Sequence, residues 1–315
     1  MTGETAERDA ARAQVKIGTR GSPLALAQAH ETRDRLIAAH DLDPGAVEVV
    51  VIKVMGDQIQ DRALAEIGGK GLFTKEIDEA LLDGRIDMAV HSMKDVPTVL
   101  PDGTEIAATL PREDVRDGFL SEAAATLAEL PAGALVGTAS LRRQAQVLHR
   151  RPDLRVATFR GNVQTRLRKL GEGEVQATFL AMAGLRRLGM AEAARSAVDV
   201  DDMLPAVAQG AIGIAARSGD ARVLSLLAPL DHPETALRVI AERAFLKRLD
   251  GSCRTPIAGL AEMVDGGLRF RGEILKPDGS ERHTVERRGA LDMAAEMGDD
   301  AAREALAAAG PDFLV

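Results

Sequence analysis

The sequence has no tryptophan and no tyrosine, and phenylalanine is its only aromatic residue type. Proteins that stack single-stranded nucleic acid bases do so on aromatic faces, so their scarcity argues against that class of partner. The formal net charge of −8 also opposes non-specific binding to a phosphate backbone. We therefore expect no nucleic acid partner, and cores packed from Ala, Val, Leu and Ile.

Cysteine is scarce as well. Cys253 is the single cysteine, so the chain cannot form an internal disulfide, which fits a reducing compartment. No stretch is long and apolar enough to span a bilayer, and the polar residues 1–14 lack the apolar core of a signal peptide. We expect a cytoplasmic protein without a membrane partner, in which residues 1–14 form a disordered leader.

Standard cofactor motifs are missing too. Gly69-Lys70-Gly71 resembles part of a phosphate loop, but no Ser or Thr follows the lysine and the upstream glycine spacing is wrong. No Gly-x-Gly-x-x-Gly follows the first predicted strand, and the six histidines include no HExxH pair. Nucleotide, NAD and metal chemistry are therefore weak interpretations, and we expect no metal.

What the sequence does contain is an alternation of short apolar runs with segments of helical spacing. At 315 residues the chain is long enough for two or three domains. The alternation predicts the α/β class, with mainly parallel sheets and helices on both faces. Strands are predicted at 15–20, 47–54, 88–92, 106–110, 134–138, 155–159, 177–181 and 211–216, and helices at 24–39, 72–83, 141–151, 163–170 and 184–194.

Two proline-containing junctions, at 110–114 and 204–210, look like crossings between domains. A chain that crosses twice returns to its first sheet, here with the segment 211–217, and this is the two-lobed, hinged design of binding-protein folds. An amphipathic helix at 234–249, antiparallel strands at 267–275 and 282–288 and a helix at 293–309 predict a small α+β domain. The predicted domain limits are 15–112 with 209–228, then 113–208, then 229–315.

Cationic residues concentrate where predicted strands pass into helices. A single arginine at such a joint is most often a solvated surface charge. Several at the same edge of two lobes instead predict a cleft for a polyanion, because guanidinium groups bind carboxylates through two parallel hydrogen bonds. In a protein that is acidic overall, small anions fit better than DNA. The cations are Arg20, Lys94, Arg142, Arg143, Arg160, Arg166 and Arg187.

Two further residues in these segments allow opposite interpretations. Asp95 follows Lys94 and would repel an anionic substrate, unless positive charge develops on that substrate during reaction; a helix cap or an ion pair with a neighbouring arginine is about as consistent with the residues. Cys253 lies in a glycine-containing loop beside Arg254, which favours an exposed thiolate. Free cysteines are, however, most often buried and inert.

Taken together, the segments closely resemble the porphobilinogen deaminase (hydroxymethylbilane synthase) family. The resemblance covers nearly the whole chain, in the order of the family's motifs. The matching stretches are 20–26 (RGSPLAL), 67–76 (IGGKGLFTKE), 91–97 (HSMKDVP), 136–143 (VGTASLRR), 160–167 (RGNVQTRL), 209–211 (QGA) and 251–259 (GSCRTPIAG).

The resemblance implies a fold of two type II periplasmic-binding-protein-like lobes joined by hinges, with a small α+β C-terminal domain. It implies a covalently attached dipyrromethane cofactor, bound by a thioether on Cys253. The reaction it implies joins four porphobilinogen molecules head to tail with loss of ammonia, and then releases a linear tetrapyrrole by hydrolysis. It further implies a monomer without a metal, in which Cys253 holds the primer.

The resemblance also implies residue roles. Asp95 is the expected catalytic residue, since its carboxylate can stabilise the cation left when ammonia departs. The expected cofactor ligands besides Cys253 are Ser92, Lys94, Thr138, Ser140, Arg142, Arg143, Gly161 and Asn162. The expected substrate ligands are Arg20, Ser22, Gln28, Lys70, Phe73, Arg160, Arg166, Arg187 and Gln209.

The chain departs from the family pattern at two places, at Ala139, where the family usually has serine, and around Cys253, where Ser252 and Arg254-Thr255 replace Gly and Gln-x. These departures affect expected contacts of the cofactor.

Three other functions remain as alternatives. A non-catalytic binding protein for a small polycarboxylate would use the same two lobes, the effector lobe of a transcription regulator would need a helix-turn-helix segment that the sequence lacks, and a nucleotide-dependent transferase would need a phosphate loop.

Overall fold

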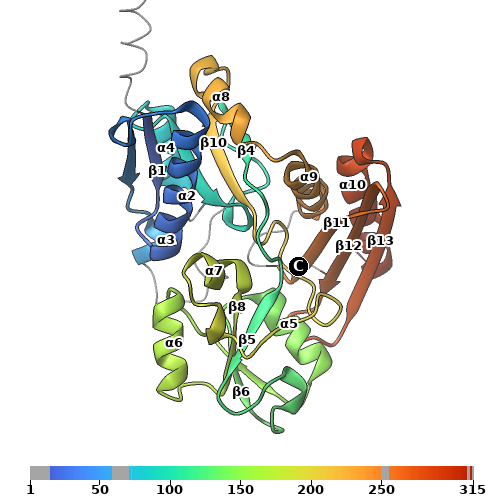
Figure 1. Ribbon diagram of the computed structural model, residues 1–315. Coiled ribbons are helices and arrows are strands. Elements are labelled where there is room, and N and C mark those ends of the chain that lie inside the picture. The colour runs from blue at the N-terminus through green and yellow to red at the C-terminus, as the bar shows by residue number, and fades with distance from the viewer. Residues whose placement is uncertain (1–14, 59–70, 72, 250–254, 311–312, 314–315) are drawn as a thin grey trace, which may run out of the picture.

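The computed structural model describes residues 15–58, 71, 73–249, 255–310 and 313. In this part of the chain the fold has two α/β lobes and a smaller α+β domain beside them (Figure 1). This is the predicted fold class of two binding-protein-like lobes of type II with a small C-terminal domain. The predicted leader at 1–14, the predicted ligand Lys70 and the predicted anchor Cys253 lie outside the described residues.

The first lobe is built on a five-stranded sheet of order β2-β1-β3-β10-β4. Its elements are β1 (Val15–Thr19), β2 (Val47–Val51), β3 (Met88–Ser92), β4 (Thr104–Thr109), β10 (Ile212–Arg217), α2 (Pro23–His40), α3 (Met55–Gln58), α4 (Lys75–Leu82) and α8 (Ala221–Leu227). Successive side chains of a strand point to opposite faces of the sheet and so pack in different cores. Met88 and Val90 pack with residues of α2 and α8, whereas Ala89 packs with residues of α4. The helices thus cover both faces of the sheet.

The second lobe repeats this plan with the strand order β7-β6-β8-β5-β9. Its elements are β5 (Asp117–Ser121), β6 (Leu135–Gly137), β7 (Arg155–Ala157), β8 (Ala177–Ala181), β9 (Ser196–Ala197), α5 (Leu141–Arg150), α6 (Val163–Gly171) and α7 (Met182–Arg187). One core contains Phe119 and Phe179, whose ring centroids lie 5.5 Å apart. Leu120 and Leu180, one residue further along each strand, face the other core with Leu185 of α7.

Two chain segments connect the lobes. From β4 the chain passes through residues 110–116 into β5, and from β9 it passes through 198–211 into β10. β10 lies in the sheet of the first lobe, as the two predicted junctions require. β10 runs antiparallel to β3 and β4, and β5 runs antiparallel to β8 and β9. The other four strands of each sheet run in one direction, so the sheets are mainly parallel, as predicted. β5 is absent from the predicted strands because its ends, Asp117 and Ser121, are polar and are buried through hydrogen bonds.

The third domain packs two helices on a three-stranded antiparallel sheet of order β11-β12-β13. Its elements are α9 (Pro233–Arg248), β11 (Ile257–Val264), β12 (Gly267–Leu275), β13 (Arg282–Gly289) and α10 (Ala294–Ala309). The helices approach so closely that a Cβ atom on Gly298 would overlap the carbonyl oxygen of Ala241. Phe245 and Phe270 form the aromatic pair of this core, with centroids 5.1 Å apart.

Several predicted boundaries differ from the structure. The helix predicted at 184–194 is divided into α7 and a single 3-10 turn, η4 (Ala191–Ala193), because Gly189 adopts φ +66° between them. The helix predicted at 72–83 begins only at Lys75. Strands β9 and β11 and helix α8 were not among the predicted elements.

Candidate active site

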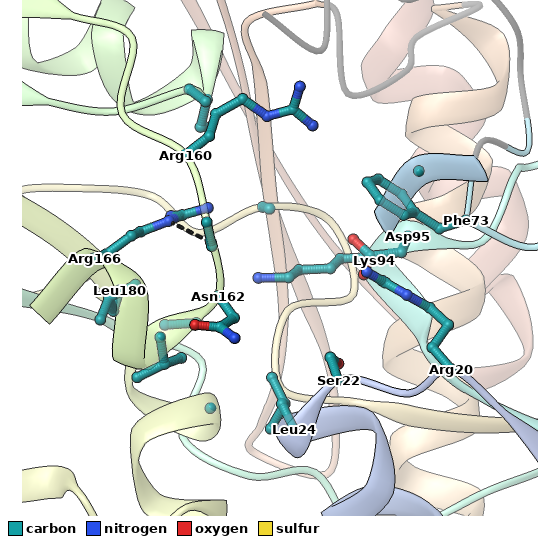
Figure 2. Close-up of a pocket in the computed structure, with 18 of the residues that line it drawn as sticks. Arg20, Ser22, Leu24, Phe73, Lys94, Asp95, Arg160, Asn162, Arg166 and Leu180 are labelled. Atoms are coloured by element: carbon teal, nitrogen blue, oxygen red, sulfur yellow. Dashed lines mark hydrogen bonds and ion pairs between the residues drawn. The ribbon is translucent and has the colours of Figure 1, made fainter. Parts of the chain in front are cut away.

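A cavity of about 690 Å³ lies between the two lobes, and Thr255 and Ile257 of the third domain contribute to its wall. It opens at the carboxyl ends of β1, β3, β6 and β7, the edge at which open α/β sheets bind ligands. Figure 2 shows side chains of the two lobes facing each other across it, with Arg20, Lys94 and Asp95 on one side and Arg160, Asn162 and Arg166 on the other.

The first-lobe wall begins where β1 passes into α2. Ser22 caps this helix by accepting a hydrogen bond from the backbone N–H of Ala25 at 3.3 Å, and Pro23 occupies the first helical position. Arg20, just before the cap, places its guanidinium carbon 4.3 Å from the ring centroid of Phe73. Its Nη1 atom lies 3.7 Å from the Asp95 carboxylate. The ion pair considered for Asp95 from the sequence is therefore present.

Lys94 and Asp95 lie on the 3-10 turn η2 (Met93–Asp95), directly after β3. Lys94 extends across the cavity toward the side of Asn162 and Arg166 (Figure 2). Burial lowers the pKa of Lys94, and Arg143 and Arg142 lower it further, while the carboxylates of Asp95 and Asp117 act in the opposite direction. Asp95 is 29% exposed at its side chain and is the only carboxylate among the described residues that line this cavity.

Two helix starts form the wall of the second lobe. Ser140 caps α5 by accepting from Arg143 N–H at 3.4 Å, and Asn162 caps α6 by accepting from Thr165 N–H at 2.8 Å. Gly161 adopts φ +121°, and a Cβ atom there would meet the side chain of Thr165. These starts direct free backbone N–H groups toward the cavity, where they favour anions.

Arg160 and Arg166 add positive charge to the same wall. The Nε atom of Arg166 donates to the carbonyl oxygen of Gly161 at 2.9 Å, which fixes the side chain toward the cavity. Burial lowers the pKa of Arg166 to about 10, and the neighbouring Arg143 and Arg160 contribute to this shift. Arg166 remains a cation at neutral pH, in surroundings that an anion would stabilise.

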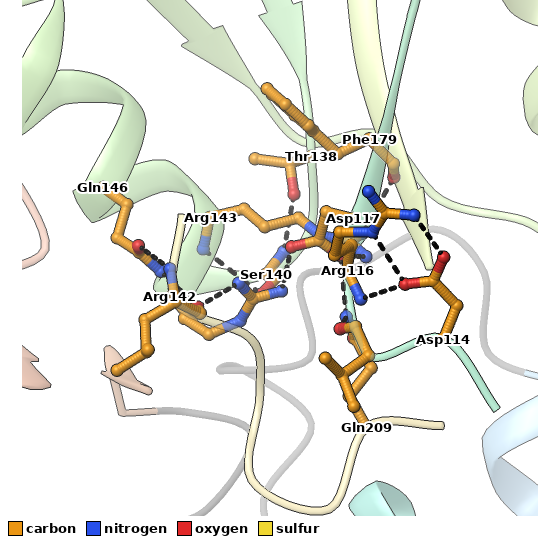
Figure 3. A network of polar contacts seen from close by, with 12 residues as sticks. Asp114, Arg116, Asp117, Thr138, Ser140, Arg142, Arg143, Gln146, Phe179 and Gln209 are labelled. Carbon is orange, nitrogen blue, oxygen red and sulfur yellow. Dashed lines mark hydrogen bonds and ion pairs between the residues drawn. The ribbon is translucent and has the colours of Figure 1, made fainter. Parts of the chain in front are cut away.

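Arg142 and Arg143 are buried at the back of the wall, and both bind Asp117, a residue that the sequence analysis missed (Figure 3). Each arginine places an Nη2 atom 2.7 Å from one carboxylate oxygen of Asp117. Burial alone would raise the pKa of Asp117. The charges and hydrogen bonds of Arg142 and Arg143 have the larger, opposite effect, so the pKa of Asp117 lies well below its usual range. The sequence held no signal for it, because the strand that Asp117 opens was not predicted and an isolated aspartate is most often exposed.

Other predicted ligands lie beside the cavity or behind it. Gln28 and Ser92 hydrogen bond to each other at 2.8 Å in a smaller cavity of about 60 Å³, which Arg20 and Asp95 also line. Thr138 is buried and accepts a hydrogen bond from Ser140 N–H at 3.1 Å. Arg187 does not line the cavity, because its guanidinium pairs with Glu31 of the first lobe at 3.4 Å and donates to the carbonyl oxygen of Gly210 at 3.0 Å.

Gln209 lines the cavity, but its amide nitrogen is engaged by Val115 and Asp117. For Lys70 and Cys253 the structure gives no placement. Thr255, which follows the cysteine loop, lies in the cavity wall.

No group of three or more His, Cys, Asp or Glu side chains in the described ranges is arranged to bind a metal ion. Nor does the described chain contain a helix that is long and apolar enough to cross a membrane.

Two family models match this chain. One is described as porphobilinogen deaminase, dipyromethane cofactor binding domain, over residues 15–225, and the other as porphobilinogen deaminase, C-terminal domain, over residues 236–307. The porphobilinogen deaminase of Paracoccus denitrificans (strain Pd 1222) is 62% identical over 300 residues, which cover 95% of this chain and 96% of that protein. The chloroplastic porphobilinogen deaminase of Oryza sativa subsp. japonica is 61% identical over 314 residues, which cover 98% and 88%.

Matches among solved structures include binding proteins at low sequence identity. The methionine-binding protein MetQ is 14% identical, with a TM-score of 0.45 over 70% of this chain and 90% of that one. A periplasmic substrate-binding protein of an ABC transporter from Coxiella burnetii is 15% identical, with a TM-score of 0.44 over 71% and 94%.

Proposed function

The chain belongs to the porphobilinogen deaminase family, and we propose that the inter-lobe cavity is where it performs the family's reaction. The protein is a hydroxymethylbilane synthase. It joins four porphobilinogen molecules head to tail with loss of ammonia, on a covalently bound dipyrromethane cofactor, and releases the linear product by hydrolysis. Family membership favours this activity over non-catalytic binding of a polycarboxylate. The observation that carries the proposed site is the convergence of cations from both lobes around one accessible carboxylate, Asp95.

The cavity wall fits a cofactor that bears carboxylates. The Nε atoms of Arg142 and Arg143 are buried without a hydrogen bond partner among the described residues, and both arginines line the cavity. Buried donors of this kind are costly unless a ligand accepts from them. When bound, dipyrromethane supplies the pyrrole terminus to which substrate units are added. We propose as its ligands Ser92, Lys94, Thr138, Ser140, Arg142, Arg143, Gly161 and Asn162, with Cys253 as its covalent attachment.

Porphobilinogen carries an acetate and a propionate group, and each requires a cationic or hydrogen-bonding partner in a closed cleft. The remaining cations of the two walls provide such partners. Arg20 is held against Phe73 and Arg166 against the carbonyl of Gly161, so both are oriented before a ligand arrives. The proposed substrate ligands are Arg20, Ser22, Gln28, Lys70, Phe73, Arg160, Arg166 and Gln209. Arg187, which pairs with Glu31 outside the cavity, is not among them.

Asp95 is proposed as the catalytic residue. Loss of ammonia leaves positive charge on the substrate pyrrole, and Asp95 can stabilise that charge in a cavity whose other charged side chains, among the described residues, are cations. The Asp95 carboxylate is also the group at which a proton can be given to the leaving amine and later taken from the pyrrole carbon. The Arg20 guanidinium, 3.7 Å away, forms an ion pair with this carboxylate.

The intact mass of the purified protein tests this function. A chain that carries the cofactor is heavier than its sequence by two pyrrole units and gives a colour reaction with an aldehyde reagent for pyrroles. The Cys253→Ala variant is expected to have the bare polypeptide mass. An unmodified mass of the wild-type protein, purified from cells that make porphobilinogen, would contradict the proposal.

The remaining proposals concern organisation and setting. We propose domain limits at 15–112 with 209–228, 113–208 and 229–315, which place each five-stranded sheet in one domain. We further propose a cytoplasmic monomer without a metal or nucleic acid partner. The single cysteine supports a reducing compartment, and the net charge of −8 opposes binding to nucleic acid.

A further inference from the structure

Asp117 is a fully buried carboxylate to which the proposed reaction assigns no role. It opens β5, directly after the first inter-lobe segment (residues 110–116). Its oxygens accept hydrogen bonds from Arg142 Nη2 at 2.7 Å, from Arg143 Nη2 at 2.7 Å and from Gln209 Nε2 at 3.0 Å (Figure 3). A carboxylate with three side-chain donors and no solvent exposure has a fixed position.

The two guanidinium groups are fixed in turn. Besides Asp117, Arg142 Nη1 donates to the carbonyl oxygen of Leu204 at 2.9 Å, and Arg143 Nη1 donates to that of Phe179 at 2.8 Å. Each planar guanidinium is therefore bound through both terminal nitrogens, which leaves it a single orientation. Only the two Nε–H donors lack a partner among the described residues.

The charges explain why a carboxylate is needed here. Arg142 and Arg143 lie side by side at a cavity that Lys94 and Arg166 also line, and like charges repel most strongly where water is excluded. Asp117 neutralises one of the two guanidinium charges, so the pair keeps an excess of positive charge toward the cavity. Without it, repulsion would drive the two side chains apart before any ligand bound.

Gln209 connects this carboxylate to the segments that join the lobes. It lies in the second inter-lobe segment (residues 198–211), and its amide nitrogen donates both to Asp117 and to the carbonyl oxygen of Val115, at 2.8 Å, in the first segment. The backbone carbonyl oxygen of Gln209 accepts a hydrogen bond from Arg112 Nε at 2.9 Å. The position of Asp117 is thus set by both crossings at once.

We propose that Asp117 is a positioning residue for carboxylate recognition, which presents the Arg142 and Arg143 guanidiniums to the cavity in one orientation and is itself fixed by Gln209. It acts through the two arginines and is not proposed to contact a ligand. The inference rests on the proposed function, because the carboxylates that the arginines meet are those of dipyrromethane and porphobilinogen. Asp117 thereby prepares the site before those carboxylates bind.

Asp117→Asn tests this, because asparagine keeps the shape and loses the charge. Asp87→Asn is the matched control: Asp87 also lies beside two arginines, Arg217 and Arg222, but at the opposite end of β3 and outside the cavity. In full-length proteins we expect Asp117→Asn to lower the fraction carrying dipyrromethane mass and to raise the KM for porphobilinogen about tenfold, with kcat of the loaded fraction changed less. Asp87→Asn is expected to lower the thermal midpoint but leave loading and KM as in the wild type.

Chemical rescue gives an independent readout. In Asp117→Ala, formate can occupy the space of the lost carboxylate and is expected to increase loading and activity, while the uncharged formamide is not. In the wild type, formate is expected to inhibit or to have no effect. Equal effects of formate and formamide on the folded variant, including no effect of either, contradict the proposal; if Asp117→Ala does not fold, Asp117→Asn decides.

The outcomes separate this inference from the proposed function. A wild-type protein without the dipyrromethane mass overturns the proposed function itself. A wild-type protein that carries this mass, together with an Asp117→Asn variant that loads equally and has an unchanged KM, overturns only the role of Asp117.

Discussion

The guanidinium of Arg112 donates two hydrogen bonds to the carboxylate of Glu242, at 2.6 and 3.0 Å, and neither side chain is more than 2% exposed. Arg112 lies in the first inter-lobe segment and Glu242 on α9 of the third domain. The same carboxylate accepts from the backbone N–H of Ala208 at 2.6 Å, in the second segment, and from that of Ala261 at 2.8 Å, in β11. One side chain therefore joins both inter-lobe segments to the third domain.

Glu242→Gln is expected to destabilise the protein strongly. It leaves the Arg112 guanidinium buried without a counter-charge, and breaking a buried pair in this way costs about 3 kcal/mol or more. Denaturant unfolding measures the loss. The exposed pair Arg85–Asp83, whose side chains are 59% and 65% exposed, supplies the control. Asp83→Asn should cost less than about 1 kcal/mol, and a similar loss in both variants would contradict a special role for the buried pair.

Gly210→Ala tests how closely the two inter-lobe segments approach. Gly210 adopts φ +87°, and a Cβ atom there would lie 2.5 Å from the carbonyl oxygen of Glu113. Gly219 adopts a similar φ of +77° with open space around it. Gly219→Ala should cost about 1 kcal/mol of backbone strain. Gly210→Ala should lower the free energy of unfolding clearly more, because the two inter-lobe segments must also separate. Equal losses in the two variants would mean that the segments move apart at no cost.

The structure agrees best with the sequence where a pattern is local. The strands β3, β8 and β12 begin and end at the predicted residues, because each is an apolar or alternating run between polar ends. The cations after β1 and β3 could also be placed together, since the carboxyl ends of parallel strands meet at one edge of a sheet. Most of one wall of the site follows from these two regularities.

What the sequence could not provide are partners that meet only through the crossings between lobes. Asp117 lies 25 residues before Arg142, and the two meet because β5 runs antiparallel beside β8. Arg187 was predicted as a substrate ligand, but it pairs with Glu31 because α7 packs against α2 of the other lobe. No local spacing contains these contacts. The roles of Asp95 and Cys253 were likewise implied by the family resemblance and not by the pattern of residues around them.

His91 is expected to make the fold sensitive to acid. Burial lowers its pKa to about 4, and repulsion from Arg20 adds to the shift, whereas the ordinary value is 6.5. Between these two values the unfolded chain binds a proton that the folded chain excludes, so stability is lost as the pH falls from 6.5 through 4. The loss from this one group is about 3 kcal/mol.

His91→Gln should remove that part of the acid sensitivity. The difference between the unfolding free energies at pH 7 and pH 4 should shrink by about 3 kcal/mol relative to the wild type. His30→Gln, at an exposed position of α2, is the matched control. An unchanged difference in His91→Gln would show that other groups cause the loss.

Asp95→Asn should separate the catalytic carboxylate from a carboxylate that only pairs with Arg20. Asparagine keeps the size of the side chain, but it neither balances positive charge on the substrate nor exchanges a proton at the reacting amine. We expect the purified variant to retain the dipyrromethane mass while its turnover falls by about 10²- to 10⁴-fold, the contribution typical of a positioned acid or base. If Asp95 serves only the 3.7 Å ion pair, Arg20→Gln should lose as much turnover at saturating porphobilinogen. If Asp95 carries the chemistry, Arg20→Gln should mainly raise KM, because its lost contact is to a substrate carboxylate. Steady-state kinetics of the two variants, with loading checked by intact mass, decide between these outcomes.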